Sequence, residues 1–214
     1  DRGSLLATGP SATNAPRRRR RLLKFFPSNR TRDSVVASVL LIRHAHAPWS
    51  PSEMRSLSDG GRKAAHRLAD RLVALPIAAV YSSPYRRATE TVSPLAARLG
   101  LDVQEHPDLR ERILGAIDPI GFDDAVAATW ADFDFAHTGG ESCREAQRRG
   151  VAAVRLIVAR HPKQLIVAST HGNILALVLN AFDPRIGFDF WRSLEFPDVF
   201  ELDLGSSDSP SFRR

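Results

Sequence analysis

The chain has 214 residues, of which 43% are hydrophobic and 25% charged, and it contains a single cysteine, Cys143. These values are typical of one globular domain with a tail, and one cysteine excludes an internal disulfide framework and a cysteine-rich zinc site. No apolar run reaches the ~18 residues of a transmembrane segment. The net charge of +6 suggests a nucleic acid or anionic membrane partner, but nine basic and only two acidic residues lie within residues 1–35. The rest of the chain is nearly neutral, so we expect no nucleic acid partner for the folded domain.

Residues 1–34 are rich in Arg, Ser, Gly and Pro and lack apolar periodicity, which predicts a disordered basic leader. This composition fits a solvated tail, an organelle transit peptide, or a tether to nucleic acid or membrane. Its apolar stretch at 22–26 is too short for a secretory signal. We expect a cytoplasmic protein, with targeting to an organelle through the leader as the alternative.

From residue 35 onward, predicted strands and helices alternate. The continuous apolar run at 35–42 predicts a strand buried on both faces, and the apolar spacing over 57–75 predicts an amphipathic helix. This alternation predicts an α/β fold, a three-layer α/β/α sandwich with a mostly parallel central sheet, over residues 35–206, followed by a polar tail at 207–214. Further strands are expected at 78–81, 101–104, 165–169 and 199–204, further helices over 85–98, 141–160 and 171–182, and a mixed segment without assigned elements at 108–140.

Polar and charged side chains directly follow three of the predicted strands. Because ligands bind beyond the carboxyl ends of parallel strands, we expect these side chains to converge there. Two imidazoles and two or three guanidiniums form a pocket suited to a tetrahedral oxyanion, and the start of a helix adds free N–H groups. The residues are Arg43 and His44 after the first strand, Ser82, Ser83, Pro84, Arg86 and Arg87 after the strand at 78–81, and His171 and Gly172 after the strand at 165–169.

Six segments resemble, in order, the motifs of the histidine phosphatase superfamily, the phosphoglycerate-mutase-like proteins. The resemblance covers residues 38–204, and its third motif selects Arg87 over Arg86 as the functional arginine. The segments are Leu41-Ile42-Arg43-His44-Ala45, Leu57-Ser58-Asp59-Gly60-Gly61-Arg62, Ser82-Ser83-Pro84-Tyr85-Arg86-Arg87-Ala88-Thr89-Glu90-Thr91, Leu109-Arg110-Glu111-Arg112-Ile113-Leu114-Gly115, Gly139-Gly140-Glu141-Ser142 and the stretch around His171-Gly172-Asn173.

The resemblance implies a role for each matching residue. His44 would attack phosphorus and form a phosphohistidine, while Glu111 would protonate the leaving oxygen and then activate water. Arg43, Arg87 and His171 would bind the phosphoryl oxygens and stabilise the transition state. The resemblance implies no metal or other cofactor, because guanidiniums and imidazoles do the electrostatic work. Gly172 and Ser50 complete the expected phosphate-binding set, and Arg62, Glu141 and His46 are further candidates for the site.

The chain departs from the family pattern just after the first histidine. Ala45 replaces the usual Gly, and His46 stands where Glu, Gln or Asp is frequent. Ala47 stands where a hydroxyl residue is usual, and Ser50 where an Asn often contacts the phosphate. These changes remove one or two neutral phosphate contacts. The charged residues are all present, so we expect an active enzyme.

Two alternatives use the same residues differently. His44 and His46 are a possible zinc pair with His171 as a third ligand, although the cationic Arg43 would repel a metal. A non-catalytic phosphate-binding module is the other alternative. Glu111 argues against it, because the binding of an anion gains nothing from a neighbouring carboxylate.

The stretch between Glu111 and Glu141 is expected to overhang the pocket and meet the leaving group. Residues 113–143 contain no Lys or Arg, although a second phosphate would need cations there. We therefore predict a metal-independent phosphomonoesterase for a small molecule with one phosphate and a neutral, apolar or cationic remainder. Phosphoglycerate mutase and protein phosphohistidine phosphatase are the alternative activities, and the sequence does not indicate the oligomeric state. The acidic residues of the stretch are Asp118, Asp123, Asp124, Asp132 and Asp134, and its apolar aromatic residues are Phe122, Trp130, Phe133 and Phe135.

Overall fold

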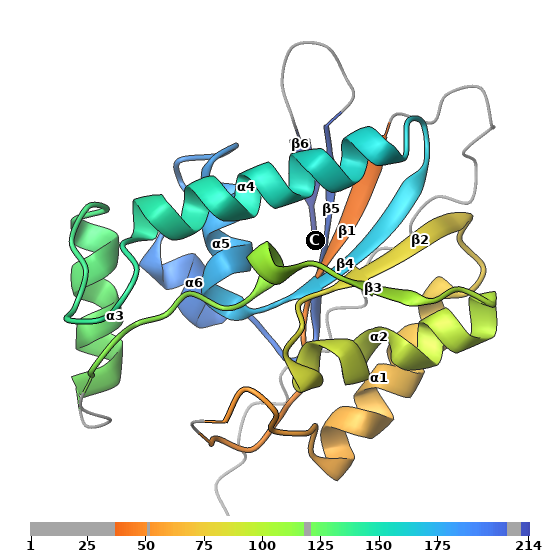
Figure 1. The fold of residues 1–214 in the computed structure, drawn as a ribbon, viewed down its shortest axis with the longest axis horizontal. Coiled ribbons are helices and arrows are strands. Elements are labelled where there is room, and N and C mark those ends of the chain that lie inside the picture. Colours follow the sequence, from red (N-terminus) through yellow and green to blue (C-terminus); the bar gives the residue numbers. More distant parts are fainter. Residues whose placement is uncertain (1–36, 51, 118–120, 205–210) are drawn as a thin grey trace, which may run out of the picture.

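A six-stranded sheet forms the centre of the molecule, as seen in a computed structural model that describes residues 37–50, 52–117, 121–204 and 211–214. The strand order is β3-β2-β4-β1-β5-β6 (Figure 1). Strands β3, β2, β4 and β1 run parallel, whereas β5 and β6 are antiparallel to their neighbours. The strands are β1 (Ser38–Arg43), β2 (Ile77–Ser82), β3 (Val103–Glu105), β4 (Leu165–Thr170), β5 (Asp198–Asp203) and β6 (Ser211–Arg213).

Helices cover both faces of this sheet, which confirms the predicted three-layer α/β/α sandwich. Helices α1 and α2 pack together on one face, and α4 and α5 lie on the other (Figure 1). The helices are α1 (Asp59–Leu72), α2 (Arg86–Leu99), α3 (Phe122–Ala131), α4 (Cys143–Arg160), α5 (Gly172–Asn180) and α6 (Phe188–Ser193).

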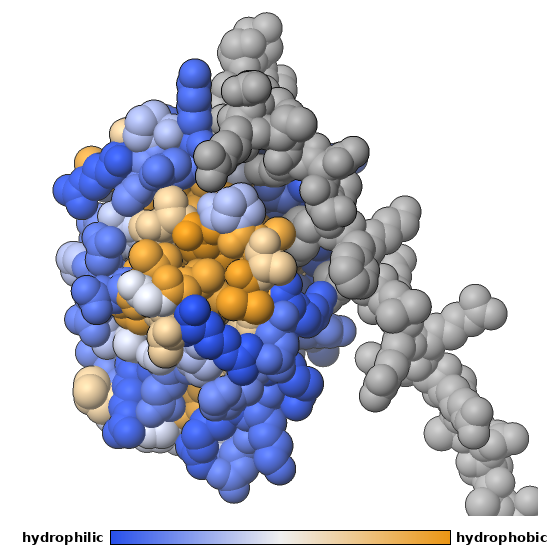
Figure 2. Space-filling view, turned by 90° about the vertical axis from the view of Figure 1, so that its right-hand side faces the viewer, coloured by the Kyte–Doolittle hydropathy of each residue, from blue (hydrophilic) through white to orange (hydrophobic). Residues whose placement is uncertain are grey.

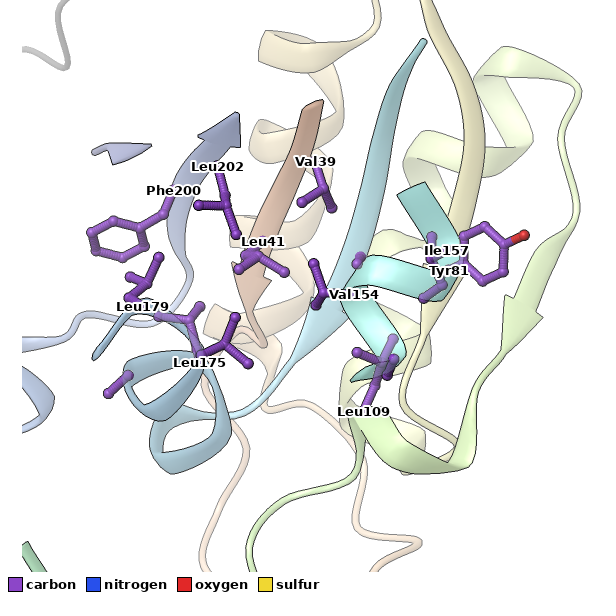
Figure 3. Packing of buried hydrophobic residues seen from close by; sticks show 14 of the residues in the cluster. Val39, Leu41, Tyr81, Leu109, Val154, Ile157, Leu175, Leu179, Phe200 and Leu202 are labelled. Carbon is purple, nitrogen blue, oxygen red and sulfur yellow. The ribbon is translucent and has the colours of Figure 1, made fainter. Parts of the chain in front are cut away.

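The apolar run of β1 explains why both faces need a helical layer. Side chains alternate along a strand, so Val39 and Leu41 face α4 and α5, while Leu40 and Ile42 face α1 and α2. Figure 3 shows Leu41 close to Leu175 of α5 in the first of these two clusters. The central strand is therefore buried on both sides, and its carboxyl end opens directly at one edge of the sheet.

Shortening Leu41 should test how much this packing contributes. The side chain is 1% exposed, and Leu41→Ala is expected to lower the free energy of unfolding by roughly 2–5 kcal/mol through lost transfer energy and a residual cavity. Denaturant unfolding at equilibrium measures this loss. The matched control is Leu156→Ala, because Leu156 on α4 is 45% exposed and should change stability by less than about 0.5 kcal/mol. Equal losses in the two variants would contradict the assignment of Leu41 to the core.

The structure adds four elements that the sequence did not predict, one of which is the short 3₁₀ helix η2 (Pro107–Leu109). Helix α3 lies inside the segment 108–140; it has only Val126 and Thr129 buried, so it shows little apolar periodicity. Helix α6 has six residues, too few for a periodic pattern. Strand β6 falls within the predicted polar tail and exists because it pairs with β5. The predicted leader, 1–34, and residues 207–210 of the tail lie outside the described residues.

The bounds of the predicted elements also shift by a few residues. The helix predicted over 57–75 occupies Asp59–Leu72, since the Ser58 hydroxyl accepts a hydrogen bond from the backbone N–H of Gly61 and caps its start. The helix predicted over 141–160 begins at Cys143, after a capping box between Ser142 and Glu145. Both corrections have the same cause: a capping side chain decides where a helix begins.

One end of the molecule presents an apolar area. Figure 2 shows it in the middle of the face that lies at the opposite end from α3, surrounded by hydrophilic residues. Apolar surface of this kind is common on folded proteins, and nothing in the described residues identifies a partner for it. Within the same described ranges, no helix is long and apolar enough to cross a membrane.

Candidate active site

Three parallel strands deliver the predicted site residues to one edge of the sheet. Strand β4 lies between β1 and β2, with Arg43 in register with Thr170 and Ser82 in register with Ser169. The next residue of β1 is His44 and the next of β4 is His171. Their rings pack edge to face with centroids 5.1 Å apart. The predicted convergence of the two histidines is therefore observed.

His44 is held with one ring nitrogen available. It is 6% exposed, and its Nδ1 lies 2.7 Å from the carbonyl oxygen of Ala45, so the ring proton resides on Nδ1 and Nε2 carries a lone pair. Arg87 Nε donates to that Nε2 at 3.1 Å. Burial, followed by the charges of Arg87, Arg43 and Arg55, lowers the pKa of His44 from 6.5 to about 3. His44 is therefore a neutral imidazole with an available lone pair at neutral pH.

This lowered pKa predicts acid sensitivity with a defined sign. Between pH 6.5 and about 3, the unfolded chain binds a proton at His44 that the folded chain excludes. The free energy of unfolding is therefore highest above pH 6.5 and decreases as the pH falls through this window. We expect His44 to account for a loss of ~1 kcal/mol of unfolding free energy per pH unit in this window. Denaturant unfolding of wild type and His44→Gln at pH 7, 6, 5 and 4 measures it. The variant should show the shallower slope, and parallel slopes would contradict the prediction.

Arg43 and Arg87 lie beside His44 without a carboxylate partner among the described residues. Arg43 Nη1 donates to the carbonyl of Leu194 at 2.7 Å, and its guanidinium stacks on the ring of Phe196 at 3.6 Å. Arg87 is 4% exposed, and burial, then the charge of Arg55, lowers its pKa to about 10. Both guanidiniums stay cationic at neutral pH. They form a buried positive site of the kind that an anion would neutralise.

The other arginine of the third motif lies on the surface. Arg86 pairs with Glu90 at 2.7 Å one turn further along α2. The motif's choice of Arg87 over Arg86 therefore agrees with the position of the two side chains.

Gly172 allows the close approach of Arg43. A β-carbon at this position would lie 3.1–3.2 Å from three atoms of the Arg43 guanidinium, closer than an ordinary contact. The glycine of the second histidine motif therefore lets the arginine lie against the start of α5.

Arg55 joins this cluster and was missed by the sequence analysis. Its charge lowers the pKa values of His44, Arg87 and His171, which places it among them, and one of its amino groups donates to the carbonyl of Ser50. No motif marked Arg55, because it lies in the irregular loop between β1 and α1. A basic residue between the first two motifs was the available signal.

We expect Arg55 to act as a third cation for the bound anion. Arg55→Gln removes the charge while keeping a polar side chain, and it should raise the KM of a monophosphate substrate at least 10-fold, in line with the loss of a charge-assisted hydrogen bond. Steady-state kinetics at constant ionic strength measures the effect. Arg67→Gln on the exposed side of α1 is the control. A change no larger than in the control would contradict the role.

Glu111 reaches the same edge by capping α5. Its carboxylate accepts hydrogen bonds from the backbone N–H groups of Asn173 at 3.2 Å and Ile174 at 3.1 Å, and from that of Arg112 at 2.9 Å. A carboxylate at the amino end of a helix is stabilised by the free N–H groups and the helix dipole. The arrangement holds Glu111 against the helix that begins directly after His171, and its charge also acts on Arg43, Arg55 and Arg87.

The remaining candidates make contacts of their own. Ser50 Oγ accepts from the backbone N–H of Ser52, and Arg62 pairs with Asp59 and donates to the carbonyl of Leu57. His46 Nδ1 lies 2.9 Å from the Ser58 hydroxyl. These contacts belong to the loop after β1 and to the start of α1, so site roles for Ser50, Arg62 and His46 stay predictions.

Glu141 connects the segment after Glu111 to α4. It pairs with Arg149 at 2.7 Å and with Arg110 at 3.1 Å, and it accepts from the backbone N–H of Ile113. Arg149 in turn donates to the carbonyl oxygen of Glu111 at 3.2 Å. This network fixes the backbone around Glu111, while a direct site role for Glu141 stays a prediction.

Gly115, four residues beyond Glu111, is required by the backbone conformation there. Gly115 has φ +81°, and a β-carbon there would lie 2.5 Å from the carbonyl oxygen of Thr138. Only glycine fits this conformation and this close approach. The last position of the Leu-x-Glu-x-x-x-Gly motif therefore serves the backbone path that leads away from Glu111.

The zinc alternative can be tested on the same geometry. Among the residues that the structure describes, no group of three or more His, Cys, Asp or Glu side chains could hold a metal ion. The cations around His44 would also repel one. The described residues therefore offer the proposed His44, His46 and His171 set no support.

The mostly parallel sheet brings two buried histidines and three arginines together at the carboxyl ends of its strands, and the molecule is an α/β protein with a cationic cluster of the kind that suits a tetrahedral oxyanion. The model of the histidine phosphatase superfamily (branch 1) matches residues 39–202, and the chain belongs to this superfamily. The resemblance read from the six motifs is thereby confirmed.

Several relatives share most of the chain. It is 32% identical over 161 residues to phosphoglycerate mutase-like protein 4 of Arabidopsis thaliana, covering 67% of this chain and 70% of the relative. It is 29% identical over 164 residues to metal-independent phosphoserine phosphatase of the same organism, with 68% of each chain covered. Among solved structures, mycobacterial glucosyl-3-phosphoglycerate phosphatase matches with a TM-score of 0.68 at 26% identity, over 82% of this chain and 95% of that one.

Proposed function

We propose that the protein is a metal-independent phosphomonoesterase that forms a phosphohistidine on His44. One observation carries the proposal: buried side-chain nitrogens without a hydrogen-bond partner among the described residues gather around His44. Of the seven buried side-chain polar atoms that lack a partner within the described residues, four belong to this cluster, namely Arg43 Nε, Arg55 Nε, Arg87 Nη1 and His171 Nδ1. Buried donors are normally satisfied, and the oxygens of a phosphoryl group would supply the missing acceptors.

The first step of the proposed reaction uses the lone pair of His44. Substrate binding gives Arg87 a phosphoryl oxygen in place of His44 Nε2, and Nε2 then attacks phosphorus. The P–N bond forms as the bond to the leaving oxygen breaks, and Glu111, whose carboxylate first takes the proton of the phosphate monoanion, donates that proton to the leaving oxygen. The guanidiniums and His171 stabilise the charge on the equatorial oxygens.

The second step returns the enzyme to its starting state. Glu111, now a carboxylate, removes a proton from water as the water oxygen attacks phosphorus. The P–N bond breaks, inorganic phosphate leaves with the proton that Glu111 took from water, and His44 is again a neutral imidazole with its proton on Nδ1. Atoms and charges balance without a metal ion, and Glu111 alternates between acid and base.

The surroundings of the cluster favour a substrate with a single phosphate. The guanidiniums of Arg110 and Arg86 each pair with carboxylates. The ring of Phe196 lies 5.4 Å from that of His44 and is 44% exposed. A leaving group that is neutral, apolar or cationic suits these side chains better than a second phosphate does. Whether the segment 113–143 meets the leaving group stays a prediction.

A chelator-treated enzyme assayed on a panel of monophosphates tests the proposal. We expect phosphate release that EDTA does not reduce, weaker turnover of bisphosphates, and no interconversion of 3- and 2-phosphoglycerate. Activity lost with chelator and restored by zinc would overturn the metal-independent mechanism. Efficient conversion of 3- to 2-phosphoglycerate would assign a mutase, and hydrolysis confined to a phosphohistidine protein would assign that class. Phosphate binding without any turnover would leave a binding module.

A further inference from the structure

The second histidine of the cluster is held by a serine to which the proposed reaction gives no role. His171 Nε2 lies 2.8 Å from the hydroxyl oxygen of Ser83, the first residue after β2. Both residues are 0% exposed. The pair lies across the edge where β2 and β4 end, and the ring of Tyr85 packs on His171 with centroids 5.0 Å apart. The contact between the Ser83 hydroxyl and His171 Nε2 bears on which nitrogen of His171 carries the proton.

The hydrogen-bonding capacity of the Ser83 hydroxyl limits the possibilities. The structure gives this oxygen two partners among the described residues: the backbone N–H of Tyr85, at 3.2 Å, and His171 Nε2. The Tyr85 N–H can only donate, so it uses an acceptor site on the oxygen. The hydroxyl proton then has one acceptor within reach, the lone pair of an unprotonated Nε2. A proton on Nε2 would leave the buried hydroxyl proton without an acceptor, at a cost of about 1–3 kcal/mol.

The state of the other ring nitrogen follows from this assignment. His171 Nδ1 is buried and has no partner in the described part of the chain. Burial, and then the charges of His44, Arg87, Arg55 and Arg149, lower the pKa of His171 well below 6.5, so the ring carries one proton. When Nε2 accepts from Ser83, that proton is on Nδ1, where it forms a donor for an incoming oxygen.

We propose that Ser83 is a positioning residue that holds His171 as the neutral Nδ1–H tautomer, so that His171 donates a neutral hydrogen bond to the transferring phosphoryl group. The inference rests on the proposed function, in which His171 binds a phosphoryl oxygen. His171 then differs from the guanidiniums: it donates a directional hydrogen bond but carries no net charge. The second serine of the Ser-Ser-Pro motif is in this proposal the residue that positions His171.

The first serine of the motif provides a matched comparison. Ser82 is also 0% exposed, but its hydroxyl donates to the carbonyl oxygen of Ser83 at 2.8 Å and does not contact His171 among the described residues. Ser82→Ala therefore removes one buried hydroxyl at the same place in the fold. It leaves the proposed tautomer unchanged.

Nitrogen NMR of the ligand-free protein tests the tautomer directly and needs no activity. Protein labelled with ¹⁵N-histidine, with His171→Gln to assign the signals, should show His171 protonated at Nδ1 and unprotonated at Nε2 from pH 6 to 8, in wild type and in Ser82→Ala. Ser83→Ala should shift the equilibrium toward Nε2–H. A wild-type ring protonated at Nε2, or at both nitrogens, would overturn the inference. So would an unchanged tautomer in Ser83→Ala.

Kinetics on the same variants tests the consequence. Ser83→Ala should lower kcat about 10- to 100-fold and weaken inhibition by vanadate by a similar factor, with KM changed less than threefold, because the donor acts mainly on the transition state. Ser83→Thr, which keeps the hydroxyl, should recover most of kcat, and Ser82→Ala should stay within about threefold of wild type. A Ser83→Ala variant with wild-type kcat would overturn the positioning role. Full activity of His44→Ala would instead overturn the proposed function, while the NMR result on the tautomer would stand.

Discussion

Replacing His44 by alanine is expected to lower kcat for a monophosphate substrate by about 10⁴-fold or more, since the variant loses the atom that attacks phosphorus. The neighbouring cations remain, so KM should change much less than kcat. Phosphate release measured at a substrate concentration well above KM reports the loss. The fold should persist, because the His44 side chain contributes a buried polar ring and not a core apolar group.

Two further measurements make this result specific. Rapid quenching with ³²P-labelled substrate should trap an acid-labile phosphoenzyme in wild type and none in His44→Ala. The control is His66→Ala, since His66 lies exposed on α1 and takes no part in the cluster. Comparable activities of His44→Ala and the control would refute the nucleophile assignment.

Replacing Glu111 by glutamine should separate the two steps of the reaction. Glutamine cannot donate the proton to an alkoxide or activate water, so kcat for an alkyl phosphate should fall by about 10²- to 10³-fold. An aryl phosphate with an acidic leaving group needs little protonation in the first step. With that substrate, the variant should release one equivalent of phenol rapidly and then accumulate phosphohistidine.

The burst of phenol from the aryl phosphate separates formation of the phosphoenzyme from its hydrolysis. Stopped-flow absorbance measures the phenol, and the quenched phosphoenzyme measures the intermediate. Glu105→Gln on the exposed edge strand β3 is the control and should behave as wild type. Wild-type turnover of the alkyl phosphate by Glu111→Gln would contradict the acid–base role, and the proton would then need another donor.

Much of the fold could be predicted because most of its strands and helices have a clear apolar pattern within their own segment of the chain. The apolar run ending at Ile42 and the run 165–168 specify strands buried on both faces, and the spacing of Leu68, Leu72 and Val92, Leu95 specifies the helices that cover one face. Helices α3 and α6 and strand β6 escaped prediction. They are short and depend on packing or pairing with distant segments, which a local pattern does not record.

Some residues of the candidate site could likewise be predicted from the sequence, and others could not. Arg43, His44 and His171 could be placed beforehand, because a residue directly after a parallel strand must lie at the carboxyl edge of the sheet. Arg87 could be selected over Arg86 by its motif, and the structure buries the former and exposes the latter. Arg55 and Phe196 were not predicted, since both lie in irregular segments whose paths depend on what they pack against.

The sequence by itself determined the class of the fold, the family and the charged residues that meet at the strand ends. The tertiary structure decided what those residues can do. The contact of His44 with the Ala45 carbonyl, the capping of α5 by Glu111 and the contact of Ser83 with His171 show how each of these three side chains is held. The last two of these contacts join residues 62 or more positions apart, and the burial that lowers the pKa of both histidines comes from packing. The positions of the motifs at the strand ends therefore bring the groups together, and packing lowers the pKa of the two histidines.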